Sequence, residues 1–220
     1  ILPQQERRRL VYLSPVALSS FAQRPHHFVH WFHNRFDADV LWIEPGPSRF
    51  PKWTDWNRLR SAKTLRSLGP TWAGSEWLSS IRFPTLPLEP VSWGRRMNRV
   101  MRQGSFHALD AFVNDHTWLV FGKPCDLALE LCSRYPQART VFDIMDNMPA
   151  FSAGFAGRWM QAAEQELVQR CNWMLVSSSA LMTRHEAYRN KIRIAKNGLS
   201  APPPLVYCDK RSNGRPVLGY

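Results

Sequence analysis

The sequence predicts an α/β protein with a Rossmann-like, doubly wound architecture, in which a mostly parallel β-sheet carries helices on both faces. Apolar stretches of strand length alternate along the chain with longer stretches whose apolar residues have helical spacing. The strand candidates are nearly continuous in apolar residues, which is typical of strands buried on both faces of a parallel sheet. Turn-forming residues close most of these stretches and mark where each element ends.

The first strand–helix–strand unit shows this pattern. A strand is expected over 10–16, a helix over 25–36 and a second strand over 39–44. Pro25 stands near the first position of the helix, where the missing N–H of proline has no helical partner to lose. Pro45 stops the second strand. A unit of this length joins two parallel strands by a right-handed crossover.

The pattern weakens from 48 to 90, where tryptophans are spread among Arg, Lys, Ser and Pro and one strand is expected over 80–86. Beyond this stretch the alternation of strands and helices returns. The later elements are a basic helix or pair of helices over 91–114, a strand over 116–121, a helix over 126–134, a strand over 140–145, a helix over 157–170, a strand over 173–176, a helix over 180–188 and a strand over 191–195. Such an alternation predicts a single doubly wound domain.

The charge of the chain and the motifs that it lacks limit the partners and the cellular location to be expected. A net charge of +12 suits a polyanionic partner, although a basic surface also serves solubility alone. The chain has no GxGxxG fingerprint and no CxxC pair, so neither a dinucleotide cofactor nor a bound metal is expected. No apolar stretch approaches the roughly 18 residues of a membrane span, and the amino terminus does not read as a signal peptide. A cytoplasmic location is therefore expected.

Candidate chemistry is found where the strand over 140–145 ends. Asp146 and Asn147 follow this strand, and Pro149 disfavours a helix directly after them. Because ligands of open α/β sheets bind at the carboxyl ends of the strands, Asp146 is a candidate base for a substrate hydroxyl. The alternative is that Asp146 only caps the turn through its own backbone. Asp143 points to the opposite face and is expected to pair with a basic group.

Several stretches carry a resemblance to a known family. They are Gln23-Arg24-Pro25-His26-His27, the Asp-x-x-Asp stretch within 141–151, Leu175-Val176-Ser177-Ser178-Ser179 with Leu181, Ala195-Lys196-Asn197-Gly198, and the closing Arg215-Pro216-Val217-Leu218-Gly219-Tyr220. Together they resemble the amino-terminal half of a GT-B glycosyltransferase, of the bacterial kind that builds capsule, exopolysaccharide or O-antigen chains. The resemblance implies an acceptor-binding, Rossmann-like domain over 1–200. It also implies that 201–220 are a linker and the first strand of a carboxyl-terminal donor-binding domain.

An activity is implied by the same resemblance: transfer of a sugar from a nucleotide-sugar, bound mainly by the donor domain, without a bound metal. The acceptor would be a cell-surface glycan or a polyprenyl-diphosphate-linked precursor. Asp146 would act as the general base, as an aspartate at the matching place does in related exopolysaccharide glucuronosyltransferases. The candidate acceptor-binding residues are Arg24, His26, His27, Asn147, Ser177 and Ser178. Each of them has a structural alternative as part of a helix start, a turn or a helix cap.

A basic segment from Arg95 to Arg102 carries four arginines with Met and Val between them, and Trp93 precedes it. It is expected either to lie on an anionic membrane, at the inner face of the cell membrane, or to be a solvated helix face. No nucleic-acid-binding motif accompanies the charge, so a nucleic-acid partner is not expected. Two rival functions stay open: a non-enzymatic Rossmann-like module that binds an anionic ligand or partner, and a basic nucleic-acid-binding protein.

Overall fold

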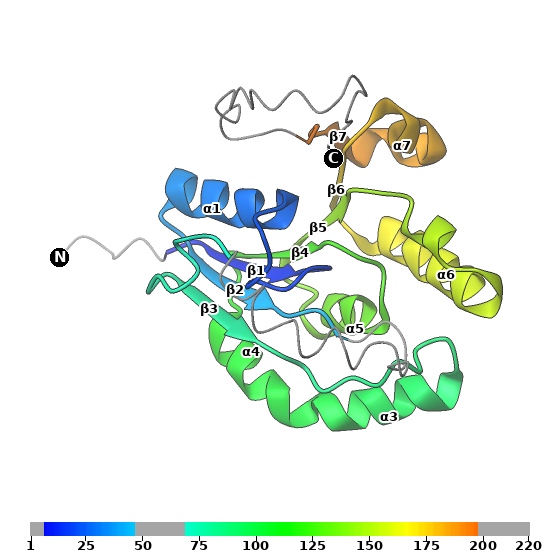
Figure 1. Cartoon of the computed structure of the whole chain (residues 1–220), viewed down its shortest axis with the longest axis horizontal. Helices are drawn as coiled ribbons and strands as arrows, with labels where there is room; N and C mark the ends of the chain where they lie inside the picture. The colour runs from blue at the N-terminus through cyan, green and yellow to red at the C-terminus, as the bar shows by residue number, and fades with distance from the viewer. Residues whose placement is uncertain (1–6, 47–68, 198–220) are drawn as a thin grey trace, which may run out of the picture.

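The computed structural model describes residues 7–46 and 69–197, which form an α/β fold around a seven-stranded, all-parallel open sheet (Figure 1). The strands are β1 (Arg9–Leu13), β2 (Asp39–Ile43), β3 (Leu78–Ile81), β4 (Thr117–Phe121), β5 (Arg139–Ile144), β6 (Trp173–Val176) and β7 (Ile192–Ile194). The helices are α1 (Arg24–Phe36), α3 (Ser92–Arg102), α4 (Phe106–Phe112), α5 (Asp126–Arg134), α6 (Gly154–Arg170) and α7 (Ser179–Arg184), with short 3₁₀ turns η2 (Gln103–Ser105), η3 (Met148–Phe151) and η4 (Glu186–Lys191). The predicted α/β class is confirmed.

The strand order determines where a ligand is expected to bind. Across the sheet the strands follow the order β3-β2-β1-β4-β5-β6-β7, so the chain winds in opposite directions from β1 and from β4. Leu13 pairs with Ile43 of β2 on one side and with Phe121 of β4 on the other, which places the carboxyl ends of these three strands at one edge. The order is consistent with a Rossmann-like doubly wound fold, whose ligands bind where the winding reverses.

Two apolar cores cover the two faces of the sheet. Leu10 and Tyr12 of β1 pack in the core that contains residues of α1, whereas Val11 and Leu13 pack in the core that contains residues of α4, α5 and α6. This separation follows from the two-residue repeat of a strand, which sends neighbouring side chains to opposite faces. Figure 1 shows α1 on one side of the sheet and α4 and α5 on the other.

Element boundaries differ from the predictions in a few places. β1 ends at Leu13, three residues earlier than expected, because the Ser14 hydroxyl donates to the Val16 carbonyl and accepts from the Val16 N–H in a tight turn. The helix expected from Gly157 begins three residues earlier. Gly157 lies inside it for a packing reason, since a Cβ there would lie 2.2 Å from the Ser152 carbonyl oxygen.

Other boundary differences concern β3 and the ends of helices. β3 covers 78–81 instead of 80–86. The basic region over 91–114 consists of α3, η2 and α4, which agrees with the expected pair of helices. The helix expected over 180–188 is α7, which ends at Arg184 and is followed by η4. The predicted linker and strand over 201–220 lie outside the described residues, as do residues 47–68.

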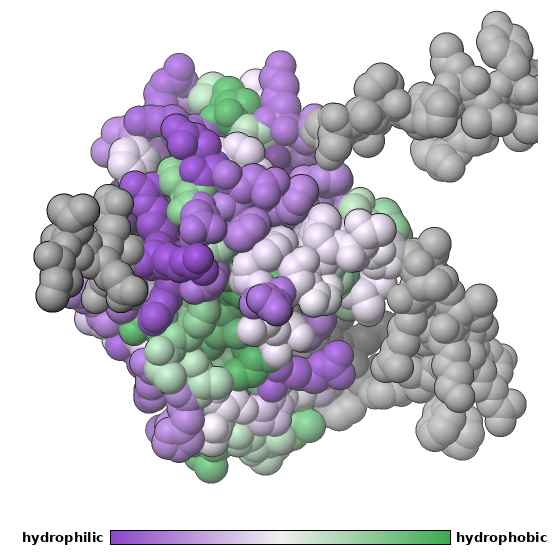
Figure 2. All heavy atoms as spheres, turned by 90° about the vertical axis from the view of Figure 1, so that its left-hand side faces the viewer, coloured by the Kyte–Doolittle hydropathy of each residue, from purple (hydrophilic) through white to green (hydrophobic). Residues whose placement is uncertain are grey.

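Surface properties bear on the expected membrane association. Among the described helices, none is both long enough and apolar enough to cross a membrane. On the face shown in Figure 2, large hydrophilic areas surround a smaller hydrophobic patch. The largest fully buried apolar side chains, such as Trp42 and Phe142, belong to the two cores.

Candidate functional site

A cavity of about 1290 Å³ opens at the carboxyl edge of the sheet. Its wall is built from the residues that follow β1, β2, β4 and β5, together with the start of α1 and one side of α6. The wall is mixed in character. Its ionisable residues include Arg24, His27, Glu44, Glu89, Lys123, Asp146 and Lys196, and its large apolar residues include Phe28, Trp31, Phe83, Phe151, Trp159 and Met160. This is the place where open α/β sheets bind ligands.

Asp146 lies on this wall, two residues after the end of β5, and its side chain is exposed. The turn that follows is closed by the backbone, since the Met148 N–H donates to the Asp146 carbonyl oxygen over 2.9 Å. Within residues 7–46 and 69–197, no hydrogen bond or ion pair holds the Asp146 carboxylate. The carboxylate is therefore placed to accept a proton from a molecule in the cavity.

Arg24, at the start of α1, contacts both β5 and the residues that follow β7. Its Nη2 lies 2.7 Å from Oδ1 of Asp143, a carboxylate buried on the α1 side of β5, which confirms that Asp143 pairs with a basic group. The Tyr12 hydroxyl donates to Asp143 Oδ2 over 2.9 Å. Nη1 of Arg24 donates to the Ala195 carbonyl and to Oδ1 of Asn197, beyond the end of β7. Because Asp143 balances its charge, Arg24 brings less net attraction for a phosphate than a free arginine would.

The two adjacent histidines have different positions. His27 lines the cavity, whereas His26 is fully buried and is absent from the wall. Nδ1 of His26 accepts from the Gln23 N–H over 3.1 Å, so the ring proton belongs on Nε2, which donates to the Leu18 carbonyl over 3.2 Å. His26 therefore supports the first turn of α1 and the loop after β1, away from the cavity wall.

Burial lowers the pKa of His26 below its usual 6.5, because the imidazolium would lose its hydration. The unfolded chain takes up a proton that the folded chain resists, so the stability provided by neutral His26 is complete above pH 6.5 and is lost as the pH falls below it. We expect the free energy of unfolding to fall from about pH 7.5 to about pH 5.5, and to fall less in His26→Gln.

Urea denaturation at each pH measures this difference. Burial also lowers the pKa of His185, so the free energy of unfolding of the His26→Gln variant still depends partly on pH. Equal slopes for the wild type and His26→Gln would contradict the assignment.

The remaining predicted contacts lie off the wall. The Ser177 hydroxyl donates to the Met145 carbonyl over 2.6 Å, which ties β6 to the end of β5. The Ser178 hydroxyl accepts from the Leu181 N–H over 3.3 Å and caps α7. Asn147 is exposed but does not line the cavity. The structure thus brings Asp146, Arg24 and His27 together, and it places His26, Asn147, Ser177 and Ser178 elsewhere.

Sequence reasoning missed several charged residues on the wall. Lys123 and Lys196 each lie two residues after a strand. Like Asp146, they could have been selected from the sequence, because ligands bind at the carboxyl ends of the strands. Glu44 directly follows β2, and burial raises the pKa of its carboxyl group. Glu89 precedes α3 in the stretch where the sequence pattern is weak, and no signal in the sequence places it at the cavity.

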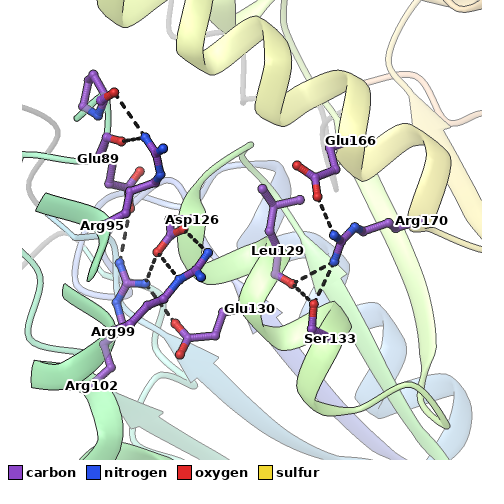
Figure 3. Close-up of polar contacts among 11 residues, drawn as sticks. Glu89, Arg95, Arg99, Arg102, Asp126, Leu129, Glu130, Ser133, Glu166 and Arg170 are labelled. Atoms are coloured by element: carbon purple, nitrogen blue, oxygen red, sulfur yellow. Dashed lines mark hydrogen bonds and ion pairs between the residues drawn. The ribbon is translucent and has the colours of Figure 1, made fainter. Parts of the chain in front are cut away.

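The basic segment is only partly a surface feature. Arg102 is fully buried and contacts Glu89, Asp126 and Glu130, while Arg99 also pairs with Asp126 (Figure 3). The expectation that all four arginines lie on a solvated or membrane-facing surface is therefore wrong for Arg102. Arg102 of α3 is instead the internal ion-pair partner of these three carboxylates.

In the described part of the chain, no group of three or more His, Cys, Asp or Glu residues is arranged to hold a metal ion. No protein-family model matches the chain, and no curated protein matches it.

Proposed function

We propose that this chain is the acceptor-binding part of a glycosyltransferase, which transfers a sugar from a nucleotide-sugar to a cell-surface glycan or lipid-linked acceptor. The observation that carries the proposal is the position of Asp146, whose carboxylate lies on the wall of a large cavity at the carboxyl edge of the sheet and has no partner among the described residues. The resemblance of the sequence to the amino-terminal half of GT-B glycosyltransferases adds support. It assigns the nucleotide-sugar mainly to a second domain.

Sugar transfer requires two things of this domain: a general base, and a binding site from which most water is excluded. Asp146 would take the proton of the acceptor hydroxyl while the hydroxyl oxygen attacks the anomeric carbon. The bond between that carbon and the nucleotide diphosphate breaks, and the diphosphate leaves with the bonding electrons. Trp31, Trp159 and Met160 give the wall apolar surface that packs against sugar rings and excludes water.

A second candidate is a non-enzymatic module that binds an anionic ligand. Lys123 and Lys196 on the wall favour it, because ammonium groups attract phosphate or carboxylate. The nucleic-acid alternative has less support, since Arg102 is buried and both Arg99 and Arg102 are paired with the Asp126 carboxylate.

The transfer reaction itself is the test. The full-length protein is incubated with UDP-, GDP- and dTDP-sugars and with polyprenyl-diphosphate-linked glycans, and nucleotide release and the mass of the acceptor are followed. We expect one nucleotide-sugar to be consumed only when an acceptor gains the mass of its sugar. Acceptor binding without consumption of any donor would favour the non-enzymatic module.

Peripheral association with the inner face of the cell membrane is part of the proposal. Trp93, Val100 and Met101 on α3 are exposed, and such side chains suit a membrane–water interface. We expect the protein to sediment with vesicles that contain anionic lipid, and Val100→Asp to reduce this binding severalfold. Equal sedimentation of the variant would show that α3 is not the contact.

A further inference from the structure

Besides Asp146, the cavity wall carries a carboxylate and an ammonium group that come from two separate parts of the chain. Glu89, which precedes α3, and Lys123, which follows β4, both line the cavity. Lys123 lies close enough to lower the pKa of the Glu89 carboxyl group, although burial is the larger influence and raises it overall. The two side chains therefore offer an acceptor and a donor on one part of the wall.

Glu89 is held in place from behind. Nη2 of Arg102 lies 3.3 Å from Oε1 of Glu89, and the same guanidinium lies 3.0 Å from Asp126 at the start of α5. Figure 3 shows Glu89 and Arg102 on one side of this cluster and Asp126 and Glu130, from α5, on the other. The charge of Arg102 is therefore balanced by carboxylates of the protein, which leaves it less attraction for a phosphate.

Hydrogen-bonding capacity indicates which ligand fits. Arg102 is fully buried and lines the cavity, and its Nε–H has no acceptor among the described residues. The wall thus combines a carboxylate acceptor, Glu89, with an ammonium donor, Lys123, and Arg102 is buried behind the carboxylate. A hydroxyl group both donates and accepts, whereas a phosphate mainly accepts. The pattern matches neighbouring hydroxyl groups better than it matches a phosphate.

We infer that Glu89 and Lys123 form a hydroxyl-binding subsite for a sugar ring of the acceptor, beside Asp146. This inference rests on the proposed function and specifies its substrate class: the reacting hydroxyl belongs to a glycan, not to a bare polyprenyl phosphate. Lys123 and Asp146 follow the adjacent strands β4 and β5, and Glu89 lines the same cavity as both of them. A glycan bound in this cavity can therefore place one hydroxyl at Asp146 and other hydroxyls at Glu89 and Lys123.

A matched pair of variants separates this role from a structural one. Glu89 and Glu130 each accept from Arg102, over 3.3 and 3.1 Å, and their side chains are 19% and 15% exposed, but only Glu89 lines the cavity. The probes are octyl glucoside, octyl galactoside, octyl mannoside and octyl phosphate, titrated into the full-length protein and followed by saturation-transfer NMR. We expect Glu89→Gln to weaken binding of the preferred glycoside about tenfold or more, and Glu130→Gln less than about twofold.

Equal losses in the two variants would overturn the subsite, and so would a wild-type protein that binds octyl phosphate but none of the glycosides. Melting temperatures of both variants show whether the fold is retained. The binding assay is independent of turnover. If glycoside binding depends on Glu89 while no nucleotide-sugar is consumed, the subsite stands and the proposed enzyme function fails.

Discussion

Asp146→Asn is expected to lower the rate of sugar transfer by about 10²- to 10⁴-fold, which is the usual contribution of a general base. Asparagine keeps the shape of the side chain but cannot take the proton of the acceptor hydroxyl. Because the carboxylate has no partner in the described part of the chain, its replacement breaks no ion pair, and the fold should be unaffected. The loss should therefore appear in kcat, with little change in the KM for the acceptor.

The measurement is the initial rate of nucleotide release by the full-length protein at saturating donor and acceptor. Asp115→Asn provides a matched control, since Asp115 is an exposed aspartate before β4, at the opposite edge of the sheet. Circular dichroism and melting temperature establish that both variants are folded. If Asp146→Asn turns over within about threefold of Asp115→Asn, the role of general base passes to another group.

The fold could be predicted because its signals are local. Most strands are short apolar stretches closed by turn residues, and these stretches lie close to where the structure has a strand; β3, Leu-Ser-Ser-Ile, is the exception. The position of Asp146 could be predicted for the same reason, since it depends only on the end of β5 and on the parallel arrangement. The largest error at a strand end is at β3, which ends at Ile81 instead of 86, in the stretch where the sequence pattern is weak. At β1 the error is smaller, because the Ser14 turn interrupts an apolar stretch.

The pairing of charges could not be predicted, because its partners are far apart in the sequence. Arg24 and Asp143 are separated by 119 residues, and nothing local distinguishes an arginine that binds Asp143 from one that binds a phosphate. Arg102 lies on what the sequence shows as one basic helix, yet its carboxylate partners come from before α3 and from α5. Helical spacing predicts which residues share a face, but not whether that face meets water or acidic groups.

Arg102→Met is expected to lower the free energy of unfolding by about 3–5 kcal/mol, which is the cost of removing one partner from a buried ion pair. Methionine fills a similar volume but carries no charge. Glu89 and Glu130 then lose their pair with Arg102, and Asp126, which is 1% exposed, keeps Arg99 as its one ion-pair partner among the described residues. For a domain of this size the loss corresponds to a fall in melting temperature of roughly 10 °C.

Arg99→Met is the matched control, because Arg99 binds the same Asp126 from the same helix but has a side chain that is 51% exposed. Hydration and salt screen such a pair, so its loss should cost less than about 1 kcal/mol. Urea denaturation of both variants gives the comparison. Equal losses would mean that the network is stabilised by its exposed part and not by the buried arginine.

The pH dependence of the Arg102→Met loss gives a second, independent check. Burial already raises the pKa values of Glu89 and Glu130 above the usual 4.5, and Arg102 acts against this rise in both. Without Arg102 their folded pKa values rise further, so each group favours the folded state below pH 4.5 and penalises it as the pH increases. The destabilisation should therefore be larger near neutral pH than in acid. A loss that does not change with pH would indicate that Arg102 acts through packing alone.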